Sequence, residues 1–351
     1  MFRLALACLL AMVASADAEA RADRRGARTP AIGLESVNGA TLDGAQASRA
    51  LLVRAAVLLD RAGISPGVID GHGGDNFDKA IRAFRMANDL GDGTTIDQPT
   101  VARLLERDPA PALVTYEITG ADVKGPWTRV IPARMEAQAR LRHLGYRNAA
   151  EQFAERFHMD VDLLQTLNPG RAFDRKGETI VVAGVEDPRT DPTRAAAIAA
   201  GQGVSRKEAA EARKSVTRIA VDKKVGTLSA FDKDGGRLMF APASIGSPEK
   251  PAPSGTLNVT RVAPNPSYTY DPKYAFKGVK AKRPFEIAAG PNNPVGSVWI
   301  ALDREGYGIH GTPEPAKVGK TQSHGCIRLT NWSALRLATL VDKGVPVEFG
   351  E

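Results

Sequence analysis

Between residues 46 and 108, apolar residues recur at the three- and four-residue intervals of amphipathic helices. Three sets predict three helices with these inward-facing residues: Leu51, Ala55, Leu58, Leu59 and Ala62; Phe77, Ala80, Ile81 and Phe84; and Val101, Leu104 and Leu105. We expect Gly63 to end the first helix, Asn76 to cap the second, and Asp97 with Pro99 to begin the third. The pattern predicts a small all-α domain at residues 46–108.

The next segment, residues 112–186, mixes strand and helix patterns. Apolar runs at 113–119 and 179–183 predict two short strands. Between them we expect two helices. The first has an apolar face formed by Ala150, Phe153, Ala154 and Phe157. The second is expected to be capped by Asp160 and to end at residues 168–170. The segment is therefore predicted to be α+β, and the Pro- and Ala-rich residues 187–214 are predicted to be a partly helical linker.

From Thr217 onward the apolar period becomes two, which predicts β-strands. Long loops rich in Pro and Gly run through residues 242–296, and a helix and a closing strand at 345–349 follow. We predict a mainly-β, sandwich-like domain at residues 215–351. An aromatic group in its loops fits two interpretations equally, cleft lining or loop packing; it comprises Tyr268, Tyr270, Tyr274 and Phe276.

The N-terminus has the pattern of a cleavable secretory signal. Arg3 precedes an apolar stretch at residues 4–13, and small residues then offer cleavage after Ala16, Ala18 or Ala20. We expect residues 1–20 to be removed and residues 21–45 to form a flexible tether. Cys8 lies inside the apolar stretch, which disfavours a lipoprotein. Cleavage leaves Cys326 as the single cysteine, so no internal disulfide is expected.

The charge balance limits the partners. The formal net charge is +7, and loss of residues 1–20 raises it by one. Basic residues are spread along the chain without interleaved aromatic residues, so we expect no nucleic-acid partner. A mildly basic surface suits an anionic polymer such as cell wall. No apolar run beyond the N-terminus is long enough to cross a membrane. From the signal pattern we expect the protein in the periplasm or cell wall, and we expect it to be a monomer.

The candidate chemistry lies near the C-terminus, where Cys326 has two nearby histidines, His310 and His324. An imidazolium or close backbone amides can lower the pKa of a thiol and make it a nucleophile. Gly325 allows close approach of the backbone, so the amides of Gly325 and Cys326 are candidates for an oxyanion hole. Together these residues predict acyl transfer.

This region resembles the catalytic domain of L,D-transpeptidases of the YkuD type. The resemblance rests on residues 310–312, residues 323–329 and Asn331, and it extends over about 217–349; matching pieces also lie at 253–256, 292–296 and 344–347. Ser333 departs from the family pattern, which often has Asp there. Parts of 46–108 resemble a three-helix peptidoglycan-binding domain, and residues 163–170 resemble the second half of a LysM domain, a binder of N-acetylglucosamine polymers.

The resemblance implies a role for each site residue. Cys326 would be the nucleophile and His310 the proton acceptor and donor, although His324 as the base remains open because it lies two residues from Cys326 on one strand. Ser323 and His324 would support them. Arg328 would hold the catalytic strand or a substrate carboxylate, and Gly311 would contact substrate. No cofactor and no metal are expected.

Two other chemistries are less consistent with the sequence. His310, His324 and Cys326 would supply three zinc ligands, but Glu314 is the only carboxylate near this segment. In papain-like proteases the Cys precedes the His, the reverse of the order here.

The resemblance implies a peptidoglycan L,D-transpeptidase. Cys326 would attack the third residue of a tetrapeptide stem, release D-Ala, and pass the acyl group to an amine on a neighbouring stem. The partners would be stem peptides and glycan strands. The alternatives are carboxypeptidase action, attachment of a protein to peptidoglycan, and a non-catalytic anchoring protein. The resemblance further implies acylation by carbapenem-type β-lactams.

Overall fold

The computed structural model describes residues 32–44, 46–187, 215–248, 250–274, 278–323 and 325–350. The expected signal peptide and nearly all of the expected linker lie outside these ranges. The part of the chain that is described contains no helix that is both long and apolar enough to cross a membrane.

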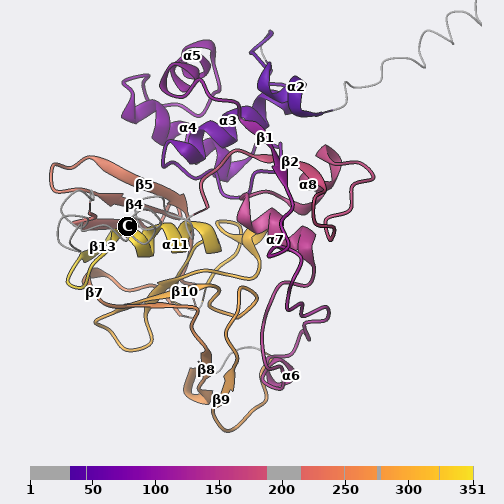
Figure 1. Cartoon of the computed structure of the whole chain (residues 1–351). Coiled ribbons are helices and arrows are strands. Elements are labelled where there is room, and N and C mark those ends of the chain that lie inside the picture. Colours follow the sequence, from indigo (N-terminus) through magenta and orange to yellow (C-terminus); the bar gives the residue numbers. More distant parts are fainter. Residues whose placement is uncertain are drawn as a thin grey trace, which may run out of the picture.

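The helical part at the top of Figure 1 has the three predicted helices, α3 (Arg49–Arg61), α4 (Asp75–Ala87) and α5 (Gln98–Arg107). The predicted boundary at Gly63 is confirmed, since this glycine has a φ of +83° just after α3. Asp97 starts α5 by accepting a hydrogen bond from Thr100 N at 2.9 Å.

Two expectations for this part are wrong. α4 begins after Gly74, and Asn76 is inside the helix, where its Nδ2 donates to Val318 O at 2.8 Å instead of capping. The tether does not extend to residue 45, because α2 (Leu34–Asn38) buries Val37, and the Asn38 side chain exchanges two hydrogen bonds with the backbone of Leu113. In both places a contact with a distant segment outweighs the local pattern.

The middle part pairs its two predicted strands, β1 (Leu113–Glu117) and β2 (Thr179–Ala183), antiparallel along their whole lengths. Between them lie α6 (Met135–Gln138), α7 (Ala149–Arg156) and α8 (Val161–Leu167). Residues 119–148, here named the arm, leave the middle part after β1 and return at α7. The arm reaches the far end of the molecule, where α6 lies beside the β8–β9 hairpin (Figure 1).

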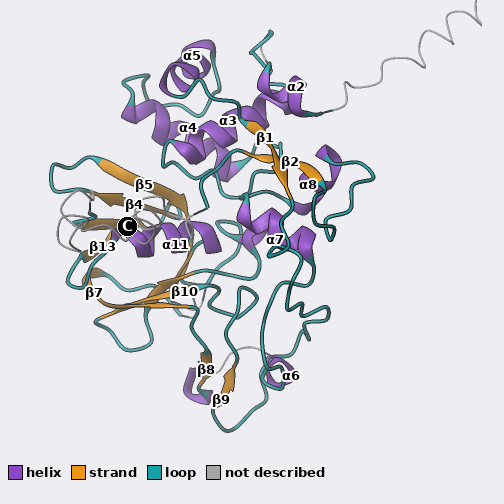
Figure 2. Cartoon of the chain, viewed as in Figure 1, coloured by secondary structure: helices purple, strands orange, loops and turns teal. Residues whose placement is uncertain are grey.

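The C-terminal part is mainly β, as predicted, with α11 (Asn331–Leu340) packed against β10 and β11 (Figure 2). Its strands are β3 (Arg218–Asp222), β4 (Thr227–Phe231), β5 (Arg237–Pro242), β6 (Ser244–Ile245), β7 (Gly255–Pro264), β8 (Tyr268–Tyr270), β9 (Phe285–Ile287), β10 (Val298–Leu302), β11 (Gly308–His310), β12 (Ile327–Arg328) and β13 (Pro346–Gly350).

Nine of these strands form one sheet in the order β5-β4-β3-β13-β7-β10-β11-β12-β6. The two outermost strands, β5 and β6, are separated in the chain only by Ala243. The sheet therefore curves until its edges nearly meet. Its apolar core includes Ile219, Ile300 and Leu337. At one end of the sheet, β12 lies between β11 and β6 and pairs with both.

The three parts pack into one body. Phe240 on β5 joins the apolar cluster that the helical and middle parts share. Its backbone forms a parallel bridge with Ile64, with Phe240 N donating to Gly63 O and Ser65 N donating to Phe240 O, each at 2.9 Å. The helical part is thus connected directly to the nine-stranded sheet.

A buried polar contact lies where all three parts meet. His158 of the middle part places Nδ1 2.9 Å from Asp60 Oδ1 of α3, and both side chains are buried. The His158 ring stacks on Trp332 of α11, with centroids 5.0 Å apart. Asp60, His158 and Trp332 each belong to a different part. Their contacts therefore help to fix the relative positions of the three parts.

Replacing Asp60 by Ala is expected to destabilise the protein by about 1–3 kcal/mol, because the buried His158 Nδ1 loses its partner. Urea unfolding would measure this. Asp43→Ala, which removes an exposed carboxylate nearby in the chain, is the control and should change stability by less than about 0.5 kcal/mol. Equal effects of the two substitutions would contradict a role for the pair.

Candidate active site

Two short parallel strands bring the predicted catalytic residues together. β11 and β12 pair with Ile309 opposite Ile327 and His310 opposite Arg328. Cys326 directly precedes β12, so the same register continues to Gly308. One strand pairing thus brings together His310 and Cys326, which fifteen residues separate in the sequence.

Cys326, His310, Ser323 and Arg328 all line one cleft of about 700 Å³. Four cationic residues line it, and no Asp or Glu is among the described residues that line it. The cationic residues are Arg134, Lys250, Arg261 and Arg328. A larger groove of about 840 Å³ lies between α4 and the strands β3 and β13, but it contains neither Cys nor His. The chemistry therefore belongs to the smaller, cationic cleft.

His310 is buried as a neutral imidazole. Its Nδ1 lies 2.6 Å from Gly311 O, and because a carbonyl only accepts, Nδ1 carries the proton and Nε2 has the free lone pair. Burial lowers the pKa of His310 to about 4, helped by the charge of Arg328. At neutral pH this residue can accept a proton, as a general base must.

Trp299, which the sequence analysis missed, supports this base. It lies directly opposite His310 in the β10–β11 pairing, and the two rings stack with centroids 5.4 Å apart and planes 21° apart. Gly308 makes room for the indole, since a Cβ there would lie 2.6 Å from Trp299 Cζ2. Only the strand register shows this contact, so no local sequence signal marks it.

Cys326 is a neutral thiol in the resting site. Its Sγ donates to Gly306 O at 3.4 Å. Burial raises the pKa of Cys326, while a hydrogen bond with the Gly308 backbone and the charges of Lys250 and Arg328 oppose the rise. His310 does not lower this pKa as an imidazolium, because burial keeps it neutral; the other histidine considered, His324, lies outside the described residues. Proton transfer must therefore accompany attack.

Ser323 holds the turn that carries the cysteine. Its Oγ accepts from Gly246 N at 2.6 Å and donates to Cys326 O at 2.5 Å, while Ser323 N donates to Gly246 O at 3.0 Å. The hydroxyl is buried and ties the turn to the end of β6. Its placement agrees with a supporting role. His324 lies outside the described residues.

Gly325 adopts a backbone conformation with φ +95°, which residues with a side chain rarely adopt. A Cβ there would lie 3.0 Å from Tyr307 Cε1 and 3.4 Å from Lys250 Cγ. The glycine thus lets the turn pass close to the cleft wall next to the nucleophile.

Replacing Gly325 by Ala is expected to slow acylation of Cys326 by a carbapenem at least about tenfold. An alanine at this positive φ is strained, and relief of that strain displaces the turn that carries Cys326. Gly235→Ala is a matched control: its φ is +79°, but open space surrounds it in the β4–β5 turn. Both variants should lose stability, and only Gly325→Ala should lose activity, as followed by intact mass. Equal acylation rates would contradict a special role for this turn.

Arg328 and Gly311 differ in position. Arg328 lines the cleft, its pKa is lowered by burial, and its buried Nε has no hydrogen-bond partner among the described residues. Gly311 is buried and does not itself line the cleft, and a Cβ there would lie 2.0 Å from Asn331 Oδ1. Contact of Gly311 with substrate stays a prediction; its observed contact is the carbonyl that orients His310.

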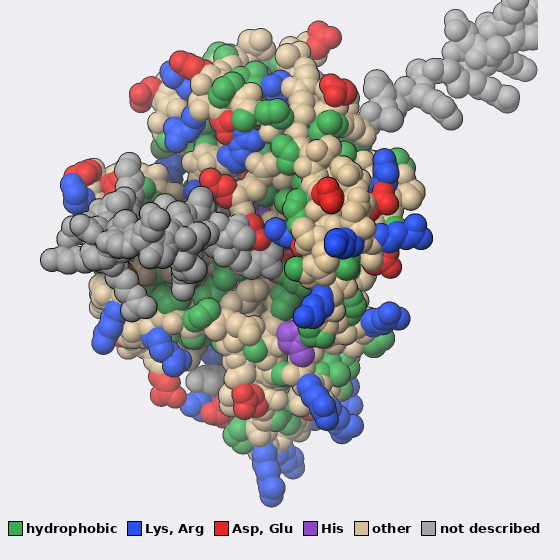
Figure 3. Space-filling view, viewed as in Figure 1, with side chains coloured by type: hydrophobic (Ala, Val, Ile, Leu, Met, Phe, Trp, Pro, Cys, Tyr) green, Lys and Arg blue, Asp and Glu red, His purple; other side chains and the backbone are tan. Residues whose placement is uncertain are grey.

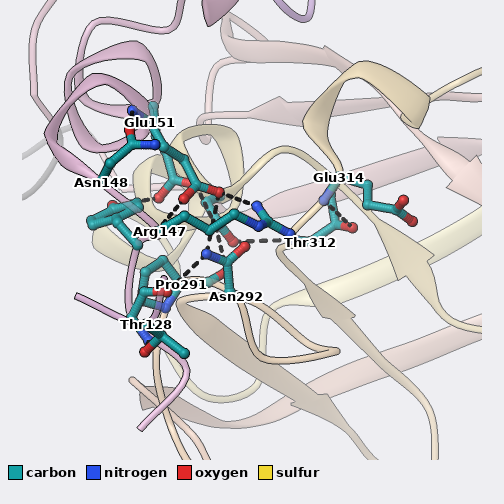
Figure 4. Close-up of polar contacts among 12 residues, drawn as sticks. Thr128, Arg147, Asn148, Glu151, Pro291, Asn292, Thr312 and Glu314 are labelled. Carbon is teal, nitrogen blue, oxygen red and sulfur yellow. Dashed lines mark hydrogen bonds and ion pairs between the residues drawn. The ribbon is translucent and has the colours of Figure 1, made fainter. Parts of the chain in front are cut away.

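Asn331 connects the active-site loops to the middle part. Its Oδ1 accepts from Ser297 N and Thr312 N at 3.0 and 3.1 Å, and its Nδ2 donates to Glu155 Oε2 and Pro291 O at 2.8 and 3.1 Å. Figure 4 shows the neighbouring part of this network, where Glu151 and Asn292 approach each other from opposite sides. The sequence analysis placed Asn331 in the motif but did not predict this bridging role.

The aromatic group divides between the two interpretations. Tyr268 lines the cleft, whereas Tyr270 is buried and stacks on Phe285 with centroids 4.9 Å apart. The side chain of Tyr274 and the whole of Phe276 lie outside the described residues. In the described part of the chain, no group of three His, Cys, Asp or Glu residues is placed to hold a metal ion.

Solved structures that resemble the chain include L,D-transpeptidase 3 from Mycobacterium tuberculosis. It is 21% identical with a TM-score of 0.32, over 39% of this chain and 60% of that chain. An L,D-transpeptidase from Mycobacterium smegmatis is 22% identical with a TM-score of 0.32, over 38% and 58%. The present chain thus matches less than two thirds of these proteins.

Curated relatives give the closer comparison. The putative L,D-transpeptidase YkuD of Bacillus licheniformis is 27% identical over 56% of this chain and 90% of its own length. The putative L,D-transpeptidase YqjB of Bacillus subtilis is 31% identical over 37% of this chain and 68% of its own length. The family model of the L,D-transpeptidase catalytic domain matches residues 216–349, which include Cys326, His310, Ser323 and Arg328. By these matches, the chain belongs to the L,D-transpeptidase family.

Proposed function

We propose that the protein cross-links peptidoglycan through an acyl-enzyme on Cys326. The observation that carries this proposal is the pairing of a neutral thiol with a neutral imidazole whose Nε2 is free to take a proton, both lining one cleft. Members of this family are acyltransferases with a cysteine nucleophile, and the region that matches the family model, residues 216–349, includes Cys326 and His310.

In the first half-reaction, Cys326 Sγ attacks the carbonyl carbon of the third residue of a tetrapeptide stem. The thiol proton passes to Nε2 of His310, and the imidazolium that forms is stabilised by its Nδ1–H bond to Gly311 O. The C–N bond to D-Ala then breaks, and His310 returns the proton to the leaving amine. The thioester product contains one acyl group and one sulfur.

In the second half-reaction, an amine of a neighbouring stem attacks the thioester carbonyl. His310 takes the amine proton and returns it to Sγ as the C–S bond breaks, which regenerates the thiol and the neutral imidazole. The backbone amides of Gly325 and Cys326 are the proposed oxyanion donors, supported by the close approach that Gly325 permits. Arg328, with an unpartnered buried Nε, is proposed to bind a substrate carboxylate in the cleft.

The two N-terminal parts are proposed to bind peptidoglycan, 46–108 as a three-helix peptidoglycan-binding domain and 112–186 as a LysM-like domain. Support comes from the sequence resemblance and from the α3–α5 and β1-α7-α8-β2 elements that the structure contains. We further propose export to the periplasm or cell wall, supported by the signal-like N-terminus.

The test uses exported protein, with its N-terminus sequenced first, and a disaccharide-tetrapeptide substrate. Mass spectrometry is expected to show dimers that lack one D-Ala. Tripeptide alone would indicate carboxypeptidase action, and neither product would favour an anchoring protein. Adding intact sacculi is expected to lower the yield from soluble substrate by competition; if sacculi had no effect, binding by the N-terminal parts would be contradicted.

A further inference from the structure

The arm, residues 119–148, belongs to the middle part by sequence but contacts the catalytic domain at both ends of its return path. Near its tip, Glu136 Oε1 accepts from Lys280 N at 3.0 Å. Near its end, Leu144 N donates to Ala289 O at 3.0 Å, and Leu144 O accepts from Asn292 N at 2.9 Å. These contacts fix the arm along the loops on either side of β9.

The arm is also braced within itself. Thr128 N donates to Tyr146 O at 2.9 Å, and the Thr128 hydroxyl donates to His143 O at 3.0 Å and accepts from Gly145 N at 3.1 Å. Leu144 is buried, and its carbonyl would lie 2.2 Å from a Cβ on Gly290. The outgoing and returning segments of the arm are therefore hydrogen-bonded to each other, and the returning segment packs against the catalytic domain.

Three consecutive arm residues, 133–135, line the cleft that contains Cys326. Arg134 brings the fourth positive charge into a cleft in which the described lining residues include no acid. Lys and Arg side chains project from this end of the molecule in Figure 3. Arg134 thus adds positive charge to a cleft that is already cationic, and an excess of positive charge favours an anionic ligand.

Arg134 is positioned to meet that ligand. Its side chain is 69% exposed, and the ion pair it makes with Glu136 is long, at 3.6 Å. The same Glu136 oxygen already accepts from Lys280 N. Most of the five guanidinium N–H donors therefore remain for a ligand, and a guanidinium matches a carboxylate with two parallel hydrogen bonds.

We propose that the arm is a substrate-binding wall of the active site and that Arg134 determines specificity by binding a free carboxylate of the stem peptide. This inference rests on the proposed function for the identity of the substrate. The middle part would then contribute to selection of the stem peptide and not only to attachment to the glycan.

The test measures binding in the Cys326→Ala background, so that turnover is not needed. Calorimetry would compare a disaccharide-tetrapeptide having free carboxylates with analogues in which each stem carboxylate is amidated in turn. One amidation is expected to weaken binding about 10- to 100-fold, the usual effect of losing a charge-assisted hydrogen bond. Arg134→Ala should weaken binding of the free acid by the same factor. In this variant, that amidation should leave the affinity unchanged.

Arg140→Ala is the matched control, because Arg140 is an exposed arginine on the same arm outside the cleft lining. It should bind every peptide within about twofold of the parent, and Arg134→Lys should fall between the parent and Arg134→Ala. Equal affinities of Arg134→Ala and Arg140→Ala, or no effect of any amidation on the parent, would overturn the proposal.

Turnover separates this inference from the proposed function. With Cys326 intact, Arg134→Ala should raise KM about 10- to 100-fold and change kcat less than about threefold, since Arg134 touches substrate away from the reacting bond. If the intact protein makes no product but binding still depends on Arg134 and one carboxylate, the proposed function fails and this inference stands.

Discussion

Replacing Cys326 by Ala is expected to lower both cross-linking and acylation by a carbapenem by more than about a thousandfold. In the proposed mechanism the sulfur is the reacting atom, so no neighbouring group replaces it. Carbapenems report on the same chemistry, because their strained lactam carbonyl is an electrophile like the stem peptide. Intact-mass measurement of the drug adduct and analysis of the peptide products would follow the two reactions.

The variant should remain folded, which makes its inactivity interpretable. Sγ donates to Gly306 O at 3.4 Å and has a hydrogen bond with the Gly308 backbone; because sulfur forms weak hydrogen bonds, stability should change by only about 1 kcal/mol. Cys326→Ser preserves that donor and should also be inactive, because a hydroxyl ionises far less readily than a thiol. A drug adduct on the alanine variant would show that the nucleophile is another residue.

The catalytic part of this structure could be predicted from sequence because its determinants are local. The motif around Cys326 and the period-two pattern after Thr217 specify short strands, and parallel pairing of β11 and β12 then places Cys326 near His310. The three helices of residues 46–108 likewise follow from the spacing of residues such as Phe77 and Phe84.

What sequence could not supply depends on distant contacts. Asn76 has the character of a helix cap, but the carbonyl of Val318 lies within its reach and takes its amide. The arm offers only a short helix and no clear periodicity, and its place in the cleft results from contacts such as Leu144 with Ala289. Burial likewise decides the charge of His310, and burial is not visible in the motif.

Because of these long-range contacts, the N-terminal parts are packed against the C-terminal part and are not separate domains joined only by linkers. Glu155 of α7 accepts from Asn331, whose other amide atom fixes the backbone beside Gly311. The middle part thus contacts the same asparagine that positions the His310 loop. Binding of glycan there would have a direct structural connection to the active site.

Replacing His310 by Ala is expected to slow carbapenem acylation about 10²–10⁴-fold at neutral pH and to change the shape of the pH profile. In the parent protein the pKa of His310 is about 4, so the imidazole is already neutral above pH 5. The rate should be flat between about pH 6 and 8 and should fall only as pH drops through about 4, where His310 gains a proton. Acid unfolding would be monitored in parallel.

Without His310 only the ionised thiol can react, and burial raises the pKa of Cys326 above its ordinary value. Below that pKa the thiolate fraction rises tenfold for each pH unit, so the acylation rate of His310→Ala should rise tenfold per unit between pH 6 and 8. His324→Ala serves as the comparison and should keep the flat profile with a smaller loss of rate. A flat profile for His310→Ala, or a tenfold rise per unit in His324→Ala, would assign the base to His324.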